Sequence, residues 1–182
     1  MEILPDGARP GAVVVPRVVV LPPAVALLRR LRDQHGPLLL HQSGGCCDGS
    51  VPYCFPVGGF LIGDHDVLLG VLDLRLEPGE VPAEAVEGAD AVPVWIAGAQ
   101  YEAWGYSQLI IDALPGPGAG FSLDETVGEH LLTRSRIFAD AEVAPLDAVV
   151  PVRGLAYERG ARPPLPTFPL VVATEADAVP SV

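Results

Sequence analysis

Short apolar runs separated by glycine and proline make up most of the chain, and one stretch alone shows a clear helical period. In residues 21–34, Ala24, Leu28 and Leu31 follow one another at spacings of four and three, which places them on one face of a helix. Gly36 follows this stretch and supplies a C-terminal stop signal. The pattern therefore predicts one helix near the N-terminus.

The other apolar runs predict strands, because they are short and have turn-forming residues at their ends. Residues 60–62 and 67–74 are expected to pair as a hairpin around a turn at 63–66, and 99–106 to form a short helix or turn. The predicted strands lie at 13–15, 38–40, 60–62, 67–74, 93–97, 108–114, 121–123 and 130–138. The fold class that follows is mainly β (α+β), a compact barrel or sandwich of short strands with one N-terminal helix.

Composition divides the chain into three segments. Its 182 residues suit one domain of ordinary size with additional segments. Residues 1–20 are expected to form a lead-in segment and residues 21–143 the core domain. From residue 144 onward, repeated prolines remove backbone donors and interrupt regular elements. Residues 144–182 are therefore predicted to form a Pro-rich, partly disordered tail that is dispensable for folding.

Charge and residue usage exclude several classes of function. All 11 basic residues besides the histidines are arginines, which excludes lysine Schiff bases and a P-loop lysine. The formal net charge of −12 argues against a nucleic-acid partner, because phosphates need a basic surface. No apolar run approaches the roughly 20 residues of a membrane helix, and neither a secretory signal nor a disulfide framework is evident. We expect a soluble cytoplasmic protein without membrane contact.

The densest group of chemically versatile residues lies in residues 41–55, which read HQSGGCCDGSVPYCF. This stretch contains Cys46, Cys47 and Cys54, all three cysteines of the chain, and it begins with His41. Its Gly-Gly pair allows a sharp turn of the backbone. Thiolate and imidazole suit zinc and iron–sulfur centres. The stretch predicts a site for zinc or an iron–sulfur centre with Cys46, Cys47, Cys54 and His41 as ligands.

Two other interpretations of the cysteines stay open. Clustered thiols react with electrophiles such as aldehydes, or with peroxides, if one of them has a lowered pKa. Buried cysteines in a tight loop instead behave as small hydrophobic residues, and the protein is then a non-catalytic binding partner. Ser43 and Ser135 show no Ser–His–Asp arrangement at the level of sequence. No catalytic residue is therefore assigned, and no enzymatic activity is predicted or excluded.

Two further polar groups have ordinary structural explanations. Residues 64–66 read Asp-His-Asp, residue types that bind metals, but a polar hairpin tip explains them better. Arg29, Arg30 and Arg32 together resemble an anion-binding patch, but the solvated face of a helix explains them better.

Four longer motifs carry a resemblance to a known family. They read HQSGGCCDGS, GDHDVLLG, QLIIDALPGPGAGFSLD and LLTRSRIF, and they fall between about residues 21 and 138. On these motifs the chain resembles the family catalogued as domain of unknown function 779. Members of that family are often encoded beside aldehyde or alcohol dehydrogenases. The resemblance thus implies an accessory role near aldehyde metabolism, with such a dehydrogenase as partner.

The order of elements also resembles that of the HesB-like A-type iron–sulfur carriers. Cys46 follows a Gly-Gly pair, as one cysteine of those carriers does, and a final Ser-Arg-Ile-Phe is similar. The two other cysteines of the carriers would fall near Leu132 and Arg134, where this chain has none. The resemblance implies a HesB-like fold with a relocated site, in which Cys47 and Cys54 replace the missing ligands.

Overall fold

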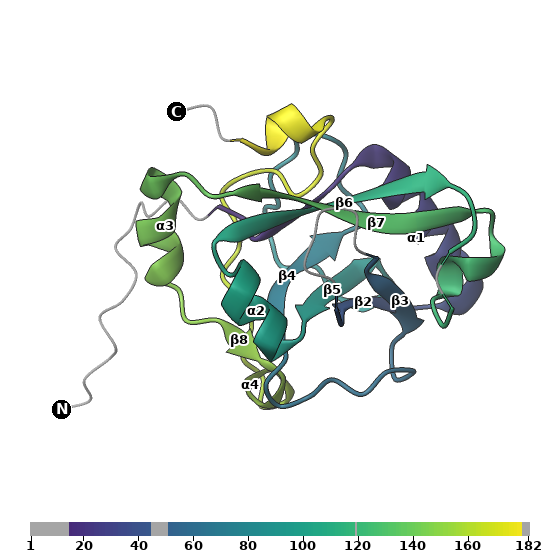
Figure 1. Cartoon of the computed structure of the whole chain (residues 1–182), viewed down its shortest axis with the longest axis horizontal. Helices are drawn as coiled ribbons and strands as arrows, with labels where there is room; N and C mark the ends of the chain where they lie inside the picture. Colours follow the sequence, from purple (N-terminus) through teal and green to yellow (C-terminus); the bar gives the residue numbers. More distant parts are fainter. Residues whose placement is uncertain (1–14, 45–50, 119, 180–182) are drawn as a thin grey trace.

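Two β-sheets and one long helix enclose a common apolar core (Figure 1). The computed structural model describes residues 15–44, 51–118 and 120–179. Within these ranges, no helix is both long enough and apolar enough to cross a membrane.

The smaller sheet has three strands in the order β1-β6-β7. β1 runs parallel to β6, and β7 runs antiparallel to β6 along the whole length of both strands. The strands are β1 (Val18–Val20), β6 (Ser107–Pro115) and β7 (Glu129–Ile137).

The larger sheet has five strands in the order β3-β2-β5-β4-β8. β2 and β5 run parallel, and the other neighbouring pairs run antiparallel. β2 therefore lies inside the sheet, and all of its residues are buried. The strands are β2 (Leu38–Gln42), β3 (Tyr53–Pro56), β4 (Val67–Asp73), β5 (Ala91–Ile96) and β8 (Val152–Arg153).

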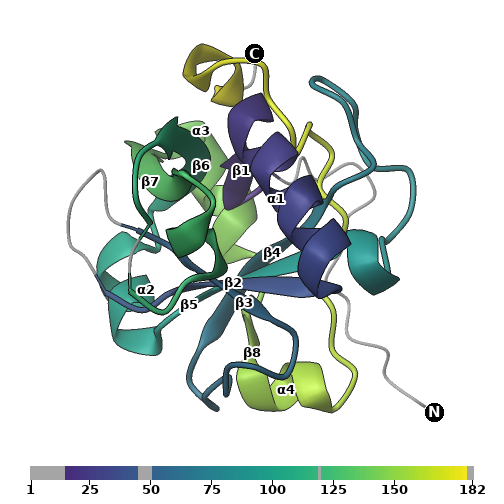
Figure 2. The ribbon, with the colours of Figure 1, turned by 90° about the vertical axis from the view of Figure 1, so that its right-hand side faces the viewer.

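The helix α1 (Pro22–His35) and the smaller sheet lie over the same face of the larger sheet (Figure 2). Ala24, Leu28 and Leu31 of α1 are fully buried in the main core cluster, which confirms the helical period seen in the sequence. Gly36 has a φ of 80° and ends the helix, because its N–H bonds to the carbonyl of Arg32. The main core thus lies between the larger sheet on one side and α1 with the smaller sheet on the other.

Shorter helices cover the edges of this core. Tyr157 of α4 packs edge-on against Trp95 of β5, with ring centroids 5.3 Å apart, on the outer face of the larger sheet. The short helices are α2 (Gly98–Trp104), α3 (Asp140–Asp147), α4 (Gly154–Glu158) and the 3-10 turns η1 (Gly88–Asp90), η2 (Leu123–Thr126) and η3 (Glu175–Ala178).

The predicted fold class is confirmed in its coarse form, because the chain is a mixed α+β protein with many short strands. The predicted strands at 38–40, 67–74, 93–97, 108–114 and 130–138 correspond to β2, β4, β5, β6 and β7. Two details differ. The described strands form two sheets rather than a closed barrel, and four helices are present rather than one. The HesB-like fold stays a prediction.

The predicted hairpin between residues 60–62 and 67–74 does not form. Residues 60–62 have no strand structure, and β4 pairs with β5 and β8 instead. The reason is aromatic packing. Phe60 stacks on Phe55 of β3 with ring centroids 4.7 Å apart, so residues 60–62 lie against β3 rather than beside β4. The turn itself is confirmed, since the N–H of Asp66 bonds to the carbonyl of Gly63 at 3.1 Å.

One other strand prediction needs correction, and one lies mostly outside the described residues. Residues 121–123 form a turn that leads into η2, and Phe121 is 90% exposed, so this short apolar run contributes no strand. A strand was expected at 13–15, of which residues 13 and 14 lie outside the described part. The first strand in the described part is β1, where Val18–Val20 is a run of three β-branched residues.

The structure shows more order after residue 144 than the sequence predicts. β8 joins the larger sheet at β4, and Val171 bridges to Val20 of β1. The N–H of Val20 bonds to the carbonyl of Leu170 at 2.9 Å, and the N–H of Val172 bonds back to the carbonyl of Val20 at 3.1 Å. This segment therefore packs along β1 as an added strand does. The division into a lead-in, a core and a tail itself stays a prediction.

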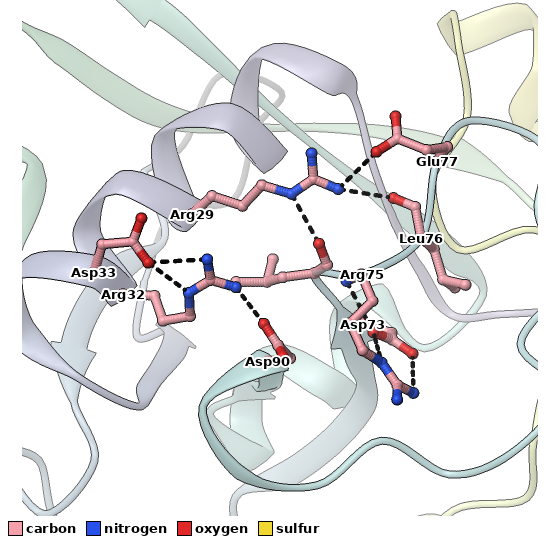
Figure 3. Close-up of polar contacts among 9 residues, drawn as sticks. Arg29, Arg32, Asp33, Asp73, Arg75, Leu76, Glu77 and Asp90 are labelled. Atoms are coloured by element: carbon pink, nitrogen blue, oxygen red, sulfur yellow. Dashed lines mark hydrogen bonds and ion pairs between the residues drawn. The ribbon is translucent and has the colours of Figure 1, made fainter.

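Two arginines of α1, Arg29 and Arg32, hold the long connection between β4 and β5 (Figure 3), whereas Arg30 pairs with Glu129 of β7. Arg29 donates to the carbonyls of Leu74 at 2.8 Å and Leu76 at 3.2 Å, and it pairs with Glu77 at 3.0 Å. Arg32 pairs with Asp33 at 2.9 Å and also with Asp90. Because these guanidinium groups contact protein oxygens, they act as a clamp on residues 74–90 rather than as an anion-binding patch.

Truncation after Phe138 is expected to prevent stable folding. It removes Leu146, Val152 and Val171, which are all buried, and burial of each such side chain contributes about 1.5–3 kcal/mol. The total stability of a domain is about 5–15 kcal/mol, so this loss is a large share. Urea unfolding followed by circular dichroism measures it, with a chain that ends at Val179 as the control. An unchanged midpoint in the chain that ends at Phe138 would show that the tail is dispensable after all.

Substitution of Glu142 by Gln is expected to destabilise the protein by about 1–3 kcal/mol at neutral pH. Arg136 donates two bonds of 2.8 Å to this carboxylate, and the N–H of Ala139 donates a third of 2.7 Å. The hydrogen bonds from Arg136 hold the pKa of Glu142 below its ordinary value. The stabilisation is therefore present above the ordinary pKa of 4.5 and is lost as pH falls through the lower pKa of the folded state.

Thermal unfolding between pH 3 and pH 7 checks this expectation. Glu142→Gln should flatten the acid dependence of the melting temperature, whereas the exposed control Glu158→Gln should follow the wild type. Parallel acid profiles for all three proteins would contradict the role assigned to the Arg136–Glu142 pair.

Candidate functional site

The polar centre of the molecule is His41, which lies near the end of β2 and is only 3% exposed. Its Nε2 lies 3.0 Å from Oδ2 of Asp66, and its Nδ1 lies 2.7 Å from Oγ of Ser43. Ser43 is exposed, and the Asp66 side chain is 16% exposed. A serine, a histidine and an aspartate thus form one hydrogen-bonded chain, in which the buried imidazole lies between two more exposed partners.

The position of His41 follows from the alternation of side chains along β2. Leu40 packs in the main core cluster, so its neighbour His41 points to the opposite face of the sheet. There His41 pairs with Tyr53 of β3 and with Trp95 of β5. Phe60 covers the imidazole, with ring centroids 4.6 Å apart. The ring is held between two strands and beneath one aromatic side chain.

Asp66 is fixed by the turn that precedes β4. Its Oδ2 accepts the N–H of Gly63 at 2.8 Å while it also contacts His41. A Cβ at Gly63 would lie 3.4 Å from this same oxygen, so the turn and the carboxylate are closely fitted. Asp66 is therefore both the turn residue that the sequence predicts and the partner of His41, which the sequence does not reveal.

The arrangement can orient His41 for either of two chemistries. An ionised carboxylate only accepts hydrogen bonds, so in the tautomer that suits this contact Nε2 carries the proton toward Asp66. Nδ1 is then unprotonated and faces Ser43. A histidine held in this way by a carboxylate is typical of a metal ligand and of a general base.

The sequence shows no Ser–His–Asp arrangement, but the fold brings Ser43, His41 and Asp66 together. His41 and Asp66 are 25 residues apart in the chain. One signal was available, since each of the two motifs places polar residues directly beside an apolar strand. Asp64 and His65 lie beside Asp66 but are exposed.

Cys54 lies on the other side of the sheet from His41. It pairs with Leu40, is fully buried and belongs to the main core cluster. Burial, together with the nearby charge of Asp124, raises the pKa of its thiol to about 12. Its backbone N–H donates to Oγ of Ser122 at 2.8 Å. A protonated, buried thiol of this kind is a poor metal ligand and a poor nucleophile.

The structure therefore separates two members of the predicted ligand set. His41 and Cys54 point to opposite faces of the larger sheet. Cys46 and Cys47 lie outside the described residues. Across residues 15–44, 51–118 and 120–179, no group of three His, Cys, Asp or Glu side chains is placed to hold a metal ion. The four-residue metal site stays a prediction.

Below the site, buried polar groups connect the two sheets. Thr133 of β7 donates to Oε1 of Gln42 of β2 at 3.0 Å. Asp124 is fully buried, and its Oδ2 accepts the N–H of Leu131 at 2.7 Å. The bond between Thr133 and Gln42 joins the end of β2, next to His41 and Ser43, to the smaller sheet, and the bond to Asp124 ties η2 to β7.

Comparison with known proteins identifies one family. The family model described as Domain of unknown function (DUF779) matches residues 27–137, a range that contains His41, Ser43 and Asp66. Neither the search of curated proteins nor the search of solved structures found a match. The resemblance to the DUF779 family is therefore confirmed, and the resemblance to HesB-like carriers stays a prediction.

Proposed function

The chain belongs to the DUF779 family, and we propose that it is an accessory protein that binds a soft metal ion or an iron–sulfur centre. The proposed ligands are His41, Cys46 and Cys47. The observation that carries the proposal is the hydrogen bond between His41 and Asp66. It orients the imidazole so that Nδ1 faces Ser43, and Cys46 and Cys47 follow Ser43 by three and four residues.

The donor types support this chemistry. Thiolates and a neutral imidazole bind zinc and iron–sulfur centres, and a carboxylate behind the imidazole raises its basicity. Cys46 also stands where the HesB-like carriers have their first cysteine, which supports a relocated site on a related fold. We leave Cys54 out of the ligand set, because its buried thiol faces the core.

A thiol that reacts with electrophiles or peroxides is the second candidate function. It is favoured by the same hydrogen-bonded chain of Ser43, His41 and Asp66, because a carboxylate-oriented imidazole can accept a proton from a nucleophile. The thiol would come from Cys46 or Cys47. In contrast, Cys54 suits the structural role that was considered for all three cysteines.

Anaerobic purification and elemental analysis test the metal proposal. Wild-type protein should contain stoichiometric zinc or iron, and His41→Ala, Cys46→Ser and Cys47→Ser should lose it. Asp66→Asn should weaken metal affinity by about 10–100-fold, because it removes the carboxylate behind the imidazole. Cys54→Ser is the matched control and should keep the metal, since this thiol lies in the core.

Two outcomes would contradict the metal proposal. One is protein that lacks metal and cannot be reconstituted with zinc or iron, and the other is equal metal loss in Cys54→Ser. Alkylation of metal-free protein then separates the remaining interpretations. One fast thiol among Cys46 and Cys47 would favour thiol chemistry, whereas three slow thiols would leave the structural interpretation. Cys54 should be slow in either case, because its pKa is about 12.

We also propose a cytoplasmic location and an aldehyde or alcohol dehydrogenase as the partner, on the resemblance to the DUF779 family. Affinity-tagged full-length protein should retain such a dehydrogenase from lysates of its own source. His41→Ala should retain the same amount if the site acts after binding. Loss of dehydrogenase retention to the level of a tag-only control would contradict the partnership without affecting the metal proposal.

A further inference from the structure

A cavity of about 150 Å³ opens beside β4, and it has no role in the His41 site. Its walls come from segments far apart in the sequence, and none of His41, Ser43 or Asp66 lines it. The contributing segments are residues 15–18, 68–71, 82–87, 149–152 and 162–166. Residues 149–152 and 162–166, which follow the last strand of the smaller sheet in the chain, thus form part of the cavity wall.

The cavity exists because β8 is too short to cover the edge of β4. β8 pairs only with Val67 and Leu68, whereas β4 continues to Asp73. The residue before β8 is Pro151, which has no N–H to extend the ladder. Past Leu68 the register of β4 against β5 also shifts by a bulge. The space along residues 69–71 of β4 is therefore left without a paired strand.

The walls of this cavity are mainly aliphatic. Three apolar clusters of the protein meet there, represented by Leu69, Leu146 and Leu68. At the mouth, Val150 is 84% exposed and Leu165 is 42% exposed. Apolar side chains thus continue from the interior to the entrance, which favours an apolar occupant.

The two arginines that line the cavity, and the most buried of its three carboxylates, are engaged with other protein atoms. Asp73 pairs with Arg75 at 2.8 Å. Arg17 donates to the carbonyl of Gly105 at 2.6 Å. Arg162 donates to the carbonyl of Tyr157 at 3.0 Å and lies 4.0 Å from the centre of that ring. An ionised ligand would have to displace these partners, so a neutral ligand is favoured.

We propose that this cavity binds one small, neutral and mainly apolar molecule, such as a short alkyl chain with one uncharged polar group. An apolar cavity of about 150 Å³ is large enough for a molecule the size of benzene. The proposal concerns a surface separate from the His41 site and does not depend on the presence of a metal there.

Titration of the full-length protein with straight-chain alcohols from 1-butanol to 1-octanol tests the proposal. Binding should be saturable and should tighten about fourfold for each added methylene until the cavity is filled, after which it should level off. The carboxylates of the same chain lengths should bind at least about tenfold more weakly, because they bring a charge into an apolar space. Isothermal titration calorimetry measures both series.

Val150→Trp places a large side chain at the mouth and should weaken 1-hexanol binding by about tenfold or more. Val57→Trp is the matched control, because Val57 is also exposed but does not line the cavity. If Val150→Trp does not fold, methyl chemical shifts of the wild type decide: Leu69 and Val149 should respond to 1-hexanol. Absence of saturable binding, equal binding of alcohols and carboxylates, or shifts confined to other residues would overturn the proposal.

Discussion

The two-sided burial of β2 is the constraint on which the rest of the structure depends. One face of this strand packs Leu40 into the core shared by α1 and both sheets, and Gln42 bonds to Thr133 across that core. The other face presents His41 beneath Phe60. Because side chains alternate along a strand, any change of register that moved Leu40 out of the core would also move His41 away from Asp66. The packing of the interior thus sets the geometry of the polar site.

Local sequence patterns predict those helices and strands in which the spacing of apolar residues within the element itself matches the face that is buried. The helix α1 and the strands β6 and β7 fall within this group, because their apolar positions match one face or one continuous buried run. The predictions fail where distant contacts decide. Residues 60–62 leave the expected hairpin because Phe60 stacks on Phe55. The proline-rich C-terminal segment is ordered because residues 170–172 bond to the edge of β1 that β6 does not pair with. Neither contact has a signature within its own segment.

The candidate site shows the same division. The sequence predicts His41 as a site residue from its place before the cysteines. For its partner Asp66, the sequence favours the role of a turn residue. Both interpretations of Asp66 hold, since one oxygen bonds to Gly63 and to His41. The opposite orientation of Cys54 could not be predicted, because it depends on the pairing of Leu40 with Cys54, and register is a property of two strands rather than of one.

The hydrogen bonds of His41 also determine which contacts would change if Nδ1 bound a metal ion or accepted a proton. A metal ion or a thiol proton at Nδ1 would replace only the contact with Ser43, which is exposed and can turn toward solvent. The bond between Nε2 and Asp66 would remain and would keep the ring in its present plane. Rotation of the imidazole is opposed further by Phe60 above it and by the neighbouring strands. In both proposals Nδ1 would be the reactive atom, and the contacts that hold the ring in place are already present.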